Sequence, residues 1–291
     1  MQSLTRSGCR VLLLGLTLLF STVALARPPI VAAASSLQAV FPHLAEAFRD
    51  ETGESLRVNF GSSGNFRRQI EQGAPFELFL SADEAYVLAL HEAGHLEDTG
   101  EVYAVGRLVW LQRKEEQGRL PGEEAPLMAV REAVAAHSNG EGRSRIALAN
   151  PEHAPYGVAA RQALVHEGLW ESTAPLRVLG ESVAQATRFA LSADARGGLV
   201  AWSQALAPPV AARGEFVMVP ADWHQPLVQR MALVKGAGDT ARAFYAWLQR
   251  EEARTILADY GFRAADDGFR AADDGFRAAG GGYRLAEGEP R

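Results

Sequence analysis

Hydrophobic positions near the start of the chain switch between a helical and an extended spacing. Six apolar residues recur every three or four positions, as on one face of a helix: Leu37, Val40, Phe41, Leu44, Ala45 and Phe48. Gly53 stands where a helix end is expected, and Leu56, Val58 and Phe60 then alternate as in a strand. The same alternation continues along the chain, and its last apolar stripe predicts one helix over 240–260. Repeated strand and helix units predict sheets covered by helices on both faces.

Two long apolar stretches, 102–112 and 228–234, bracket a middle block that repeats this alternation. We expect them to be crossovers between two lobes, an arrangement that creates a cleft with a hinge. The predicted fold is an α/β protein of two lobes, each a mostly parallel sheet flanked by helices. One lobe comprises residues 29–107 and 228–262, and the other comprises residues 108–227.

The two ends of the chain differ in composition from the part between them. Two arginines precede an apolar run over 11–20, and Ala24-Leu25-Ala26 matches the site that a signal peptidase cuts, so residues 1–26 are predicted to be a signal peptide for export to the periplasm. Cys9, the only cysteine, would be removed with it, which leaves no disulfide and no cysteine metal site. A seven-residue unit recurs near the other end, and residues 263–291 are predicted to be a repetitive, disordered tail.

Two turns in the first lobe join a strand end to adjacent serines and a following helix, at Ser35-Ser36 and at Ser62-Ser63. A serine at a helix start presents its hydroxyl beside unpartnered backbone N–H groups at the positive end of the helix dipole, which suits an anion. A single capping serine usually binds nothing, but two more such turns, at Tyr156 and at Ser182-Val183, lie in the middle block. The formal net charge of -6 shows no basic footprint for nucleic acid, so local dipoles would have to hold the anion.

Two enzymatic interpretations compete with an anion site. His91-Glu92-Ala93-Gly94-His95 matches the H-E-x-x-H pattern, so a periplasmic zinc hydrolase using His91, Glu92 and His95 is an alternative of a different class. That chemistry needs both histidines on one face of a continuous helix, whereas Gly94 stands where the helix is expected to end. A serine hydrolase has less support, because the flanks of Ser35-Ser36 differ from G-x-S-x-G. The phosphate-loop pattern of nucleotide-binding proteins is absent from the sequence.

The serine turns and their neighbours carry a resemblance that extends, in consistent order, from Pro29 to Phe262. The segments concerned are Ala32-Ala33-Ala34-Ser35-Ser36-Leu37, Phe60-Gly61-Ser62-Ser63, Arg68 to Pro75, Leu78 to Asp83, Pro151-Glu152-His153, Pro155-Tyr156-Gly157, Glu181-Ser182-Val183 and Tyr260-Gly261-Phe262. In these segments the chain resembles the periplasmic molybdate-binding proteins of ABC uptake systems, which have the type II periplasmic binding protein fold.

The resemblance implies a solute-binding protein and not an enzyme. Such a protein captures molybdate, and also tungstate, in the periplasm and delivers it to an ABC permease in the inner membrane. It is a monomer without a cofactor, and it binds the metal as an oxyanion, not through side-chain ligands. Within the same class, another tetrahedral oxyanion such as sulfate is the alternative ligand.

The resemblance also assigns binding residues by position. Those implied to hold the oxyanion are Ser35, Ser63, Tyr156 and Val183, with Ser36 as a further donor. The serines would give hydroxyl and backbone hydrogen bonds, and Tyr156 and Val183 mainly backbone N–H groups. Some members supply a tyrosine hydroxyl at the position where Ala201 stands here. Either the Tyr156 hydroxyl replaces that donor, or the site has one donor fewer.

Overall fold

The computed structural model describes residues 27–114, 119–142 and 144–264. The predicted signal peptide over 1–26 and the predicted tail from residue 265 onward lie outside the described residues. Among the helices that are described, none is both long enough and apolar enough to cross a membrane.

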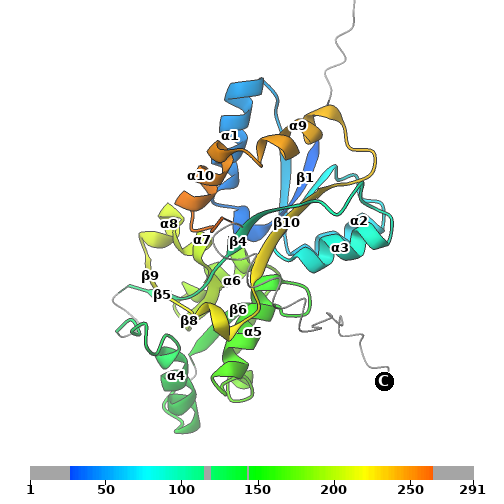
Figure 1. The fold of residues 1–291 in the computed structure, drawn as a ribbon. Coiled ribbons are helices and arrows are strands. Elements are labelled where there is room, and N and C mark those ends of the chain that lie inside the picture. The colour runs from blue at the N-terminus through cyan, green and yellow to red at the C-terminus, as the bar shows by residue number, and fades with distance from the viewer. Residues whose placement is uncertain (1–26, 115–118, 143, 265–291) are drawn as a thin grey trace, which may run out of the picture.

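The chain forms two lobes, each built on a five-stranded sheet (Figure 1). The sheet of lobe 1 has the order β2 (Arg57–Gly61), β1 (Ile30–Ala34), β3 (Leu78–Ser81), β10 (Leu227–Leu233) and β4 (Glu101–Gly106). Its helices are α1 (Phe41–Thr52), α2 (Ser63–Glu71), α3 (Glu84–Glu92), α9 (Asp239–Trp247) and α10 (Glu251–Asp259). A short 3-10 helix, η1 (Ser35–Leu37), follows β1.

Lobe 2 repeats this plan with the strand order β7 (Arg177–Gly180), β6 (Arg145–Ala149), β8 (Ala195–Ala201), β5 (Leu108–Arg113) and β9 (Gly214–Met218). Its helices are α4 (Met128–Ser138), α5 (Pro155–His166), α6 (Val183–Ala190), α7 (Trp202–Ala205) and α8 (Pro208–Ala211), with 3-10 turns η2 (Ala174–Leu176) and η3 (Ala221–Trp223). The predicted two-lobe α/β fold is thus present.

In each sheet one strand runs against the other four. β10 is antiparallel to both β3 and β4, and β5 is antiparallel to both β8 and β9, whereas the remaining neighbours pair in parallel. Each reversed strand is the one that enters its sheet from the other lobe. The carboxyl ends of the parallel strands in both lobes therefore point to the boundary between the lobes, where ligands bind in open α/β sheets.

Two connections join the lobes. The predicted extended stretch 102–112 forms two strands, β4 and β5, that are separated by Arg107 alone. The return connection runs from β9 through η3 into β10. The lobe boundaries given by the sequence stay a prediction, and the strand assignments are compatible with them.

Among the described residues, lobe 2 contains one cluster of buried apolar side chains and lobe 1 contains two. In lobe 1, Phe48 is fully buried and meets Phe244 edge to face with ring centroids 5.1 Å apart, while Trp247 stacks on Phe244. In lobe 2, Trp110 is fully buried and lies so close to Gly197 that an added methyl group there would meet its ring at 2.4 Å. Ala34 and Ala82, at the strand ends of lobe 1, pack with the lobe 2 core. Apolar contact is thus continuous across the boundary.

Two predicted helices are wrong in detail. The first was expected to begin at the Ser35-Ser36 turn, but these serines belong to η1 and the α-helix begins at Phe41. The reason is Pro42, which has no N–H to donate to an earlier turn and therefore lies in the first turn of α1. The second, predicted as one helix over 240–260, is divided into α9 and α10 by an extended Arg250. Two glutamates follow Arg250, as suits a new helix start.

Candidate functional site

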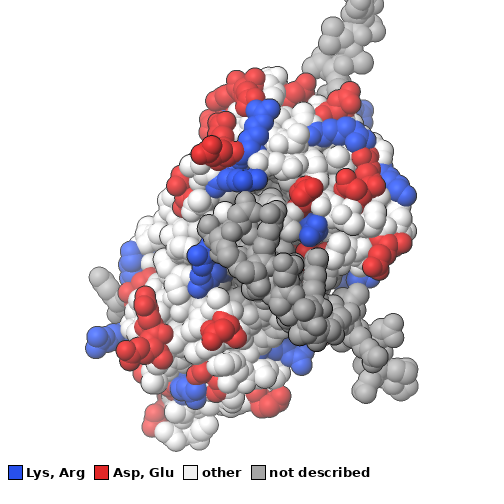
Figure 2. Space-filling model, in the orientation of Figure 1, with Lys and Arg blue, Asp and Glu red and all other residues white. Residues whose placement is uncertain are grey.

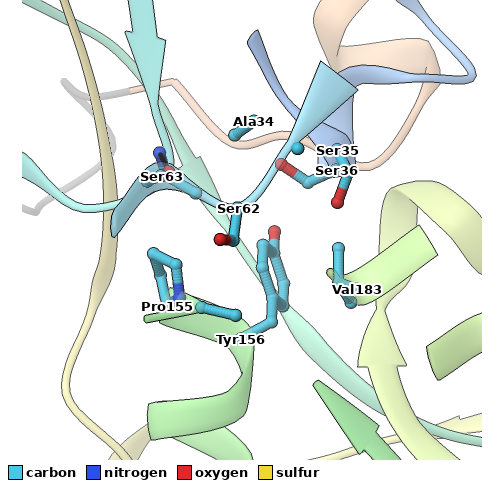
Figure 3. Close-up of a pocket in the computed structure, with 11 residues that line it drawn as sticks. Ala34, Ser35, Ser36, Ser62, Ser63, Pro155, Tyr156 and Val183 are labelled. Carbon is cyan, nitrogen blue, oxygen red and sulfur yellow. Dashed lines mark hydrogen bonds between the residues drawn. The ribbon is translucent and has the colours of Figure 1, made fainter. Parts of the chain in front are cut away.

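All five sequence-predicted binding residues line one pocket at the boundary between the lobes (Figure 3). The residues around it are Ala34, Ser35, Ser36, Gly61, Ser62, Ser63, Ala82, Ala154, Pro155, Tyr156 and Val183. The first seven follow or end the strands β1, β2 and β3 of lobe 1, and the last four belong to the turns that open α5 and α6 of lobe 2. The pocket is therefore built from the carboxyl ends of strands in one lobe and helix starts in the other.

Two serine hydroxyls in this pocket already accept hydrogen bonds from the backbone. The Ser63 hydroxyl oxygen accepts from the Ala82 N–H at 2.9 Å, and the Ser35 hydroxyl oxygen accepts from the Ala184 N–H at 3.4 Å. A hydroxyl group has one proton to donate and two lone pairs that can accept. In each of these serines the backbone N–H occupies one lone pair. Both protons remain available to a ligand, so the two serines are suited to donate to an anion.

Ser36 and Tyr156 add two more hydroxyl groups. Ser36 is fully buried and its hydroxyl oxygen has no hydrogen-bond partner. The Tyr156 side chain is also buried, and Figure 3 shows its hydroxyl on the side of the pocket where Ser35 and Ser36 lie. Burial raises the pKa of Tyr156 well above its usual range; the nearby Ser36 hydroxyl opposes this, although the two groups fall short of hydrogen-bond geometry. Tyr156 is therefore a neutral donor at physiological pH.

Backbone N–H groups complete the donor set on the side of lobe 2. Val183 is the first residue of α6, and Tyr156 is the second residue of α5. The first N–H groups of a helix have no partner inside that helix, and they lie at the positive end of its dipole. Ala201 ends β8 and is not part of the pocket lining, whereas Tyr156 is.

Hydrogen bonds across the boundary hold the lobes together beside the pocket. The Gly64 N–H donates to the His153 carbonyl at 2.9 Å, and the Ser62 hydroxyl lies 2.9 Å from His153 Nδ1. At the other side, the Ser203 hydroxyl donates to the Ser36 carbonyl at 2.7 Å, and Gln204 Nε2 donates to the Ser35 carbonyl at 2.8 Å. These contacts close the pocket from both lobes.

The pocket is small and its lining is uncharged. The space among the lining residues is about 190 Å³, and part of it is open to solvent, so the pocket suits a small ligand. No lysine, arginine, aspartate or glutamate is among the lining residues. On the face drawn in Figure 2, acidic and basic side chains are interspersed over both lobes. The chemistry of the site is that of several neutral donors converging on a small space.

Sequence reasoning missed part of this site. Ser62 was quoted only as the neighbour of Ser63, yet it lines the pocket and contacts His153. Ala82, Ala154 and Pro155 contribute apolar wall, and small apolar residues carry no chemical signal in a single sequence. The serine pair in Ser62-Ser63 and the Pro-Tyr-Gly turn were the only local signals that could have pointed to them.

The H-E-x-x-H segment does not form a metal site in the described residues. His91 lies in the last turn of α3, which ends at Glu92, and Gly94 follows in the left-handed conformation with φ 80°. His95 is therefore outside the helix that carries His91. Within residues 27–114, 119–142 and 144–264, no group of three or more histidine, cysteine, aspartate or glutamate side chains could hold a metal ion.

Comparisons with known proteins identify the family of this chain. Residues 30–263 match the family model described as bacterial extracellular solute-binding protein. The molybdate-binding protein ModA of Rhodobacter capsulatus is 35% identical over 237 residues, which cover 80% of this chain and 87% of that protein. ModA of Azotobacter vinelandii is 34% identical over 235 residues, covering 80% of this chain and 88% of that protein.

Solved structures lead to the same group. The periplasmic molybdate-binding protein of Azotobacter vinelandii superposes with a TM-score of 0.70 at 29% identity, covering 81% of this chain and 98% of that chain. The sulfate-binding protein SubI of Mycobacterium tuberculosis has a TM-score of 0.65 at 14% identity, with 87% of this chain and 91% of that chain covered, which reflects a shared fold. The chain therefore belongs to the bacterial extracellular solute-binding proteins and, within them, to the family of the ModA molybdate-binding proteins.

Proposed function

We propose that this protein captures molybdate in the pocket between its lobes, within the periplasm, and delivers it to an ABC permease of the inner membrane. Ser35, Ser63, Tyr156 and Val183 hold the oxyanion, and Ser36 gives a further hydrogen bond. Tungstate, which has the same shape and charge, is bound as well. The protein is a monomer, needs no cofactor and turns over no substrate.

The observation that carries the proposal is the unpartnered Ser36 hydroxyl among other donors. A buried polar group without a partner costs about 1–3 kcal/mol, so an enclosed hydroxyl of this kind is best explained by a ligand that accepts from it. The hydroxyl protons of Ser35 and Ser63 and the helix-start N–H groups of lobe 2 converge on the same space. Several donors that converge on one space suit a ligand with acceptors on several sides, as a tetrahedral oxyanion has.

The uncharged lining favours a fully deprotonated anion. Taking a dianion out of water costs a great deal of free energy unless its oxygens are completely hydrogen-bonded, because no opposite charge lies in the pocket. Phosphate keeps a proton near neutral pH, and that proton would need an acceptor. Sulfate carries no proton but is smaller than molybdate and tungstate, so closure around it would leave longer hydrogen bonds.

Binding and closure are linked in this proposal. Lobe 1 contributes the serine hydroxyls and lobe 2 the helix-start N–H groups, so only the closed form bonds the anion from both sides. Ligand binding energy therefore shifts the molecule toward the closed form. A permease that recognises the closed shape would accept the loaded protein in preference to the open one.

Isothermal titration calorimetry of the purified protein tests the proposal. We expect molybdate and tungstate to bind at micromolar concentrations or below and sulfate to compete weakly. Ser35→Ala and Ser63→Ala should each weaken molybdate binding about 10- to 100-fold, the equivalent of a hydrogen bond to a charged group of about 1.5–3 kcal/mol. Ser138→Ala, an exposed serine of α4, is the matched control and should bind normally. Absence of molybdate and tungstate binding at micromolar concentrations would refute the function, and normal binding by both site variants would refute the site.

A further inference from the structure

His153 lies where the two lobes touch, at the rim of the pocket and outside the set of oxyanion donors. It is buried in the turn between β6 and α5 of lobe 2, and both its backbone and its side chain contact lobe 1. Its carbonyl accepts from the Gly64 N–H, and its Nδ1 atom lies 2.9 Å from the Ser62 hydroxyl. Ser62 in turn is the N-cap residue of α2 and part of the pocket lining.

The surroundings of the ring determine which nitrogen carries the proton. Its Nε2 atom lies 3.3 Å from the Glu181 carboxylate, which can only accept a hydrogen bond when ionised. Burial lowers the pKa of His153, and Arg68 adds to this, while Glu181 and Glu152 oppose it. The positive end of α2 also faces the ring and disfavours an imidazolium there. The neutral ring with its proton on Nε2 satisfies Glu181 and leaves Nδ1 as an acceptor.

That tautomer gives the contact with lobe 1 a direction. With Nδ1 as the acceptor, the Ser62 hydroxyl must donate to it. Because the two residues belong to different lobes, this bond forms only when the lobes are closed. Glu181 and His153 are both in lobe 2 and stay together when the lobes separate, whereas Ser62 belongs to lobe 1. Opening therefore breaks one side-chain hydrogen bond at this residue and leaves the Glu181 contact in place.

We propose that His153 is a positioning residue that fastens the closed lobes through Ser62 and thereby sets how long the captured anion stays bound. This inference rests on the proposed function, because the anion is the ligand whose release is measured. The Glu181 carboxylate holds the ring in the accepting tautomer. The contact forms after the anion has entered, so it acts on dissociation and leaves association unchanged.

The test compares His153→Ala with His153→Asn. The Asn side-chain oxygen stands at the position of Nδ1 and can accept from Ser62, whereas Ala cannot. Dissociation is measured by diluting protein loaded with radiolabelled molybdate into an excess of unlabelled molybdate. We expect His153→Ala to release the anion about 3- to 10-fold faster, the equivalent of one hydrogen bond, with an association rate within twofold of the original. His153→Asn should restore slow release, and His43→Ala, an exposed histidine of α1, should not change it.

A double-mutant cycle with Ser62→Ala identifies the partner. If the two residues act through one bond, the double variant releases molybdate no faster than either single variant. Equal release by His153→Ala and the original protein, failure of Asn to restore it, or full additivity with Ser62→Ala would each overturn the inference. If the original protein binds no oxyanion, the proposed function itself fails. The inference about release then fails with it, because no anion is held between the lobes.

Discussion

Replacing Gly64 by alanine adds only one methyl group, but it should strongly affect the closure of the two lobes. Gly64 is the second residue of α2, and its N–H donates to the His153 carbonyl at 2.9 Å. A methyl group added at Gly64 would lie 2.7 Å from that carbonyl oxygen and 3.0 Å from His153 Cα. Both neighbours are backbone atoms of the other lobe, so they cannot move aside as a flexible side chain would.

The magnitude follows from the separation that Gly64→Ala requires. Ordinary contact with a Cβ atom begins at 3.4 Å, so the lobes must part by about 0.7 Å at this point. The Gly64 hydrogen bond then exceeds 3.5 Å and is lost, and the Ser62 to His153 bond is stretched with it. At about 0.5–1.5 kcal/mol each, these losses amount to about 1–3 kcal/mol, or molybdate binding weakened about 5- to 150-fold.

Calorimetry with molybdate, combined with urea unfolding without it, separates closure from folding. Alanine favours a helix over glycine by up to about 1 kcal/mol, so the free energy of unfolding of Gly64→Ala should be unchanged or higher. Gly122→Ala is the matched control, because nothing lies within 4 Å of its added methyl group. Molybdate binding by Gly64→Ala at the original affinity would refute the reasoning, since it would mean that the lobes do not meet at His153 in the loaded form.

Three further substitutions test other parts of the structure. Tyr156→Phe should weaken molybdate binding about 10- to 100-fold in calorimetry if the hydroxyl donates to the anion, and unchanged affinity would show that only the backbone N–H of this residue takes part. Gly106→Ala places a methyl group 2.2 Å from the Tyr156 hydroxyl, so it should weaken binding as well, and this loss should be smaller when it is measured in the Tyr156→Phe background. A double variant whose loss equals the sum of the two single losses would contradict the steric explanation. Phe48→Ala, in the core of lobe 1, should lower the free energy of unfolding by about 3–5 kcal/mol in urea while the folded fraction binds molybdate normally, and a loss under 1 kcal/mol would contradict the packing with Phe244.

The fold was accessible from the sequence because apolar spacing and strand-to-helix turns are local signals. The two lobes and their crossovers could be predicted because two stretches with the pattern of strands stand on either side of a second series of alternating strands and helices. The errors arose where one residue interrupts an otherwise continuous apolar stripe. Pro42 delays the start of α1, and the extended Arg250 divides the last helix, although the stripe continues through both.

The site could be predicted only as far as its residues carry recognisable chemistry. The hydroxyls of Ser35 and Ser63 and the turn at Tyr156 carry such chemistry, and all three lie at one pocket. The contact of Ser62 with His153 joins residues 91 positions apart, and a single sequence contains no signal for such a pair. Nor does it contain the orientation of the hydroxyl protons, which depends on backbone donors such as the Ala82 N–H.

The buried Ser36 hydroxyl bears on how the proposed function would separate loaded protein from empty protein. When the closed form holds an anion, this hydroxyl can donate to a charged acceptor, a hydrogen bond that contributes about 1.5–3 kcal/mol to the loaded form. That contribution alone would favour the loaded closed form about 10- to 150-fold over a closed form in which the bond is absent. In the proposed function, one buried oxygen would thus lower how often a permease meets the closed form without its anion.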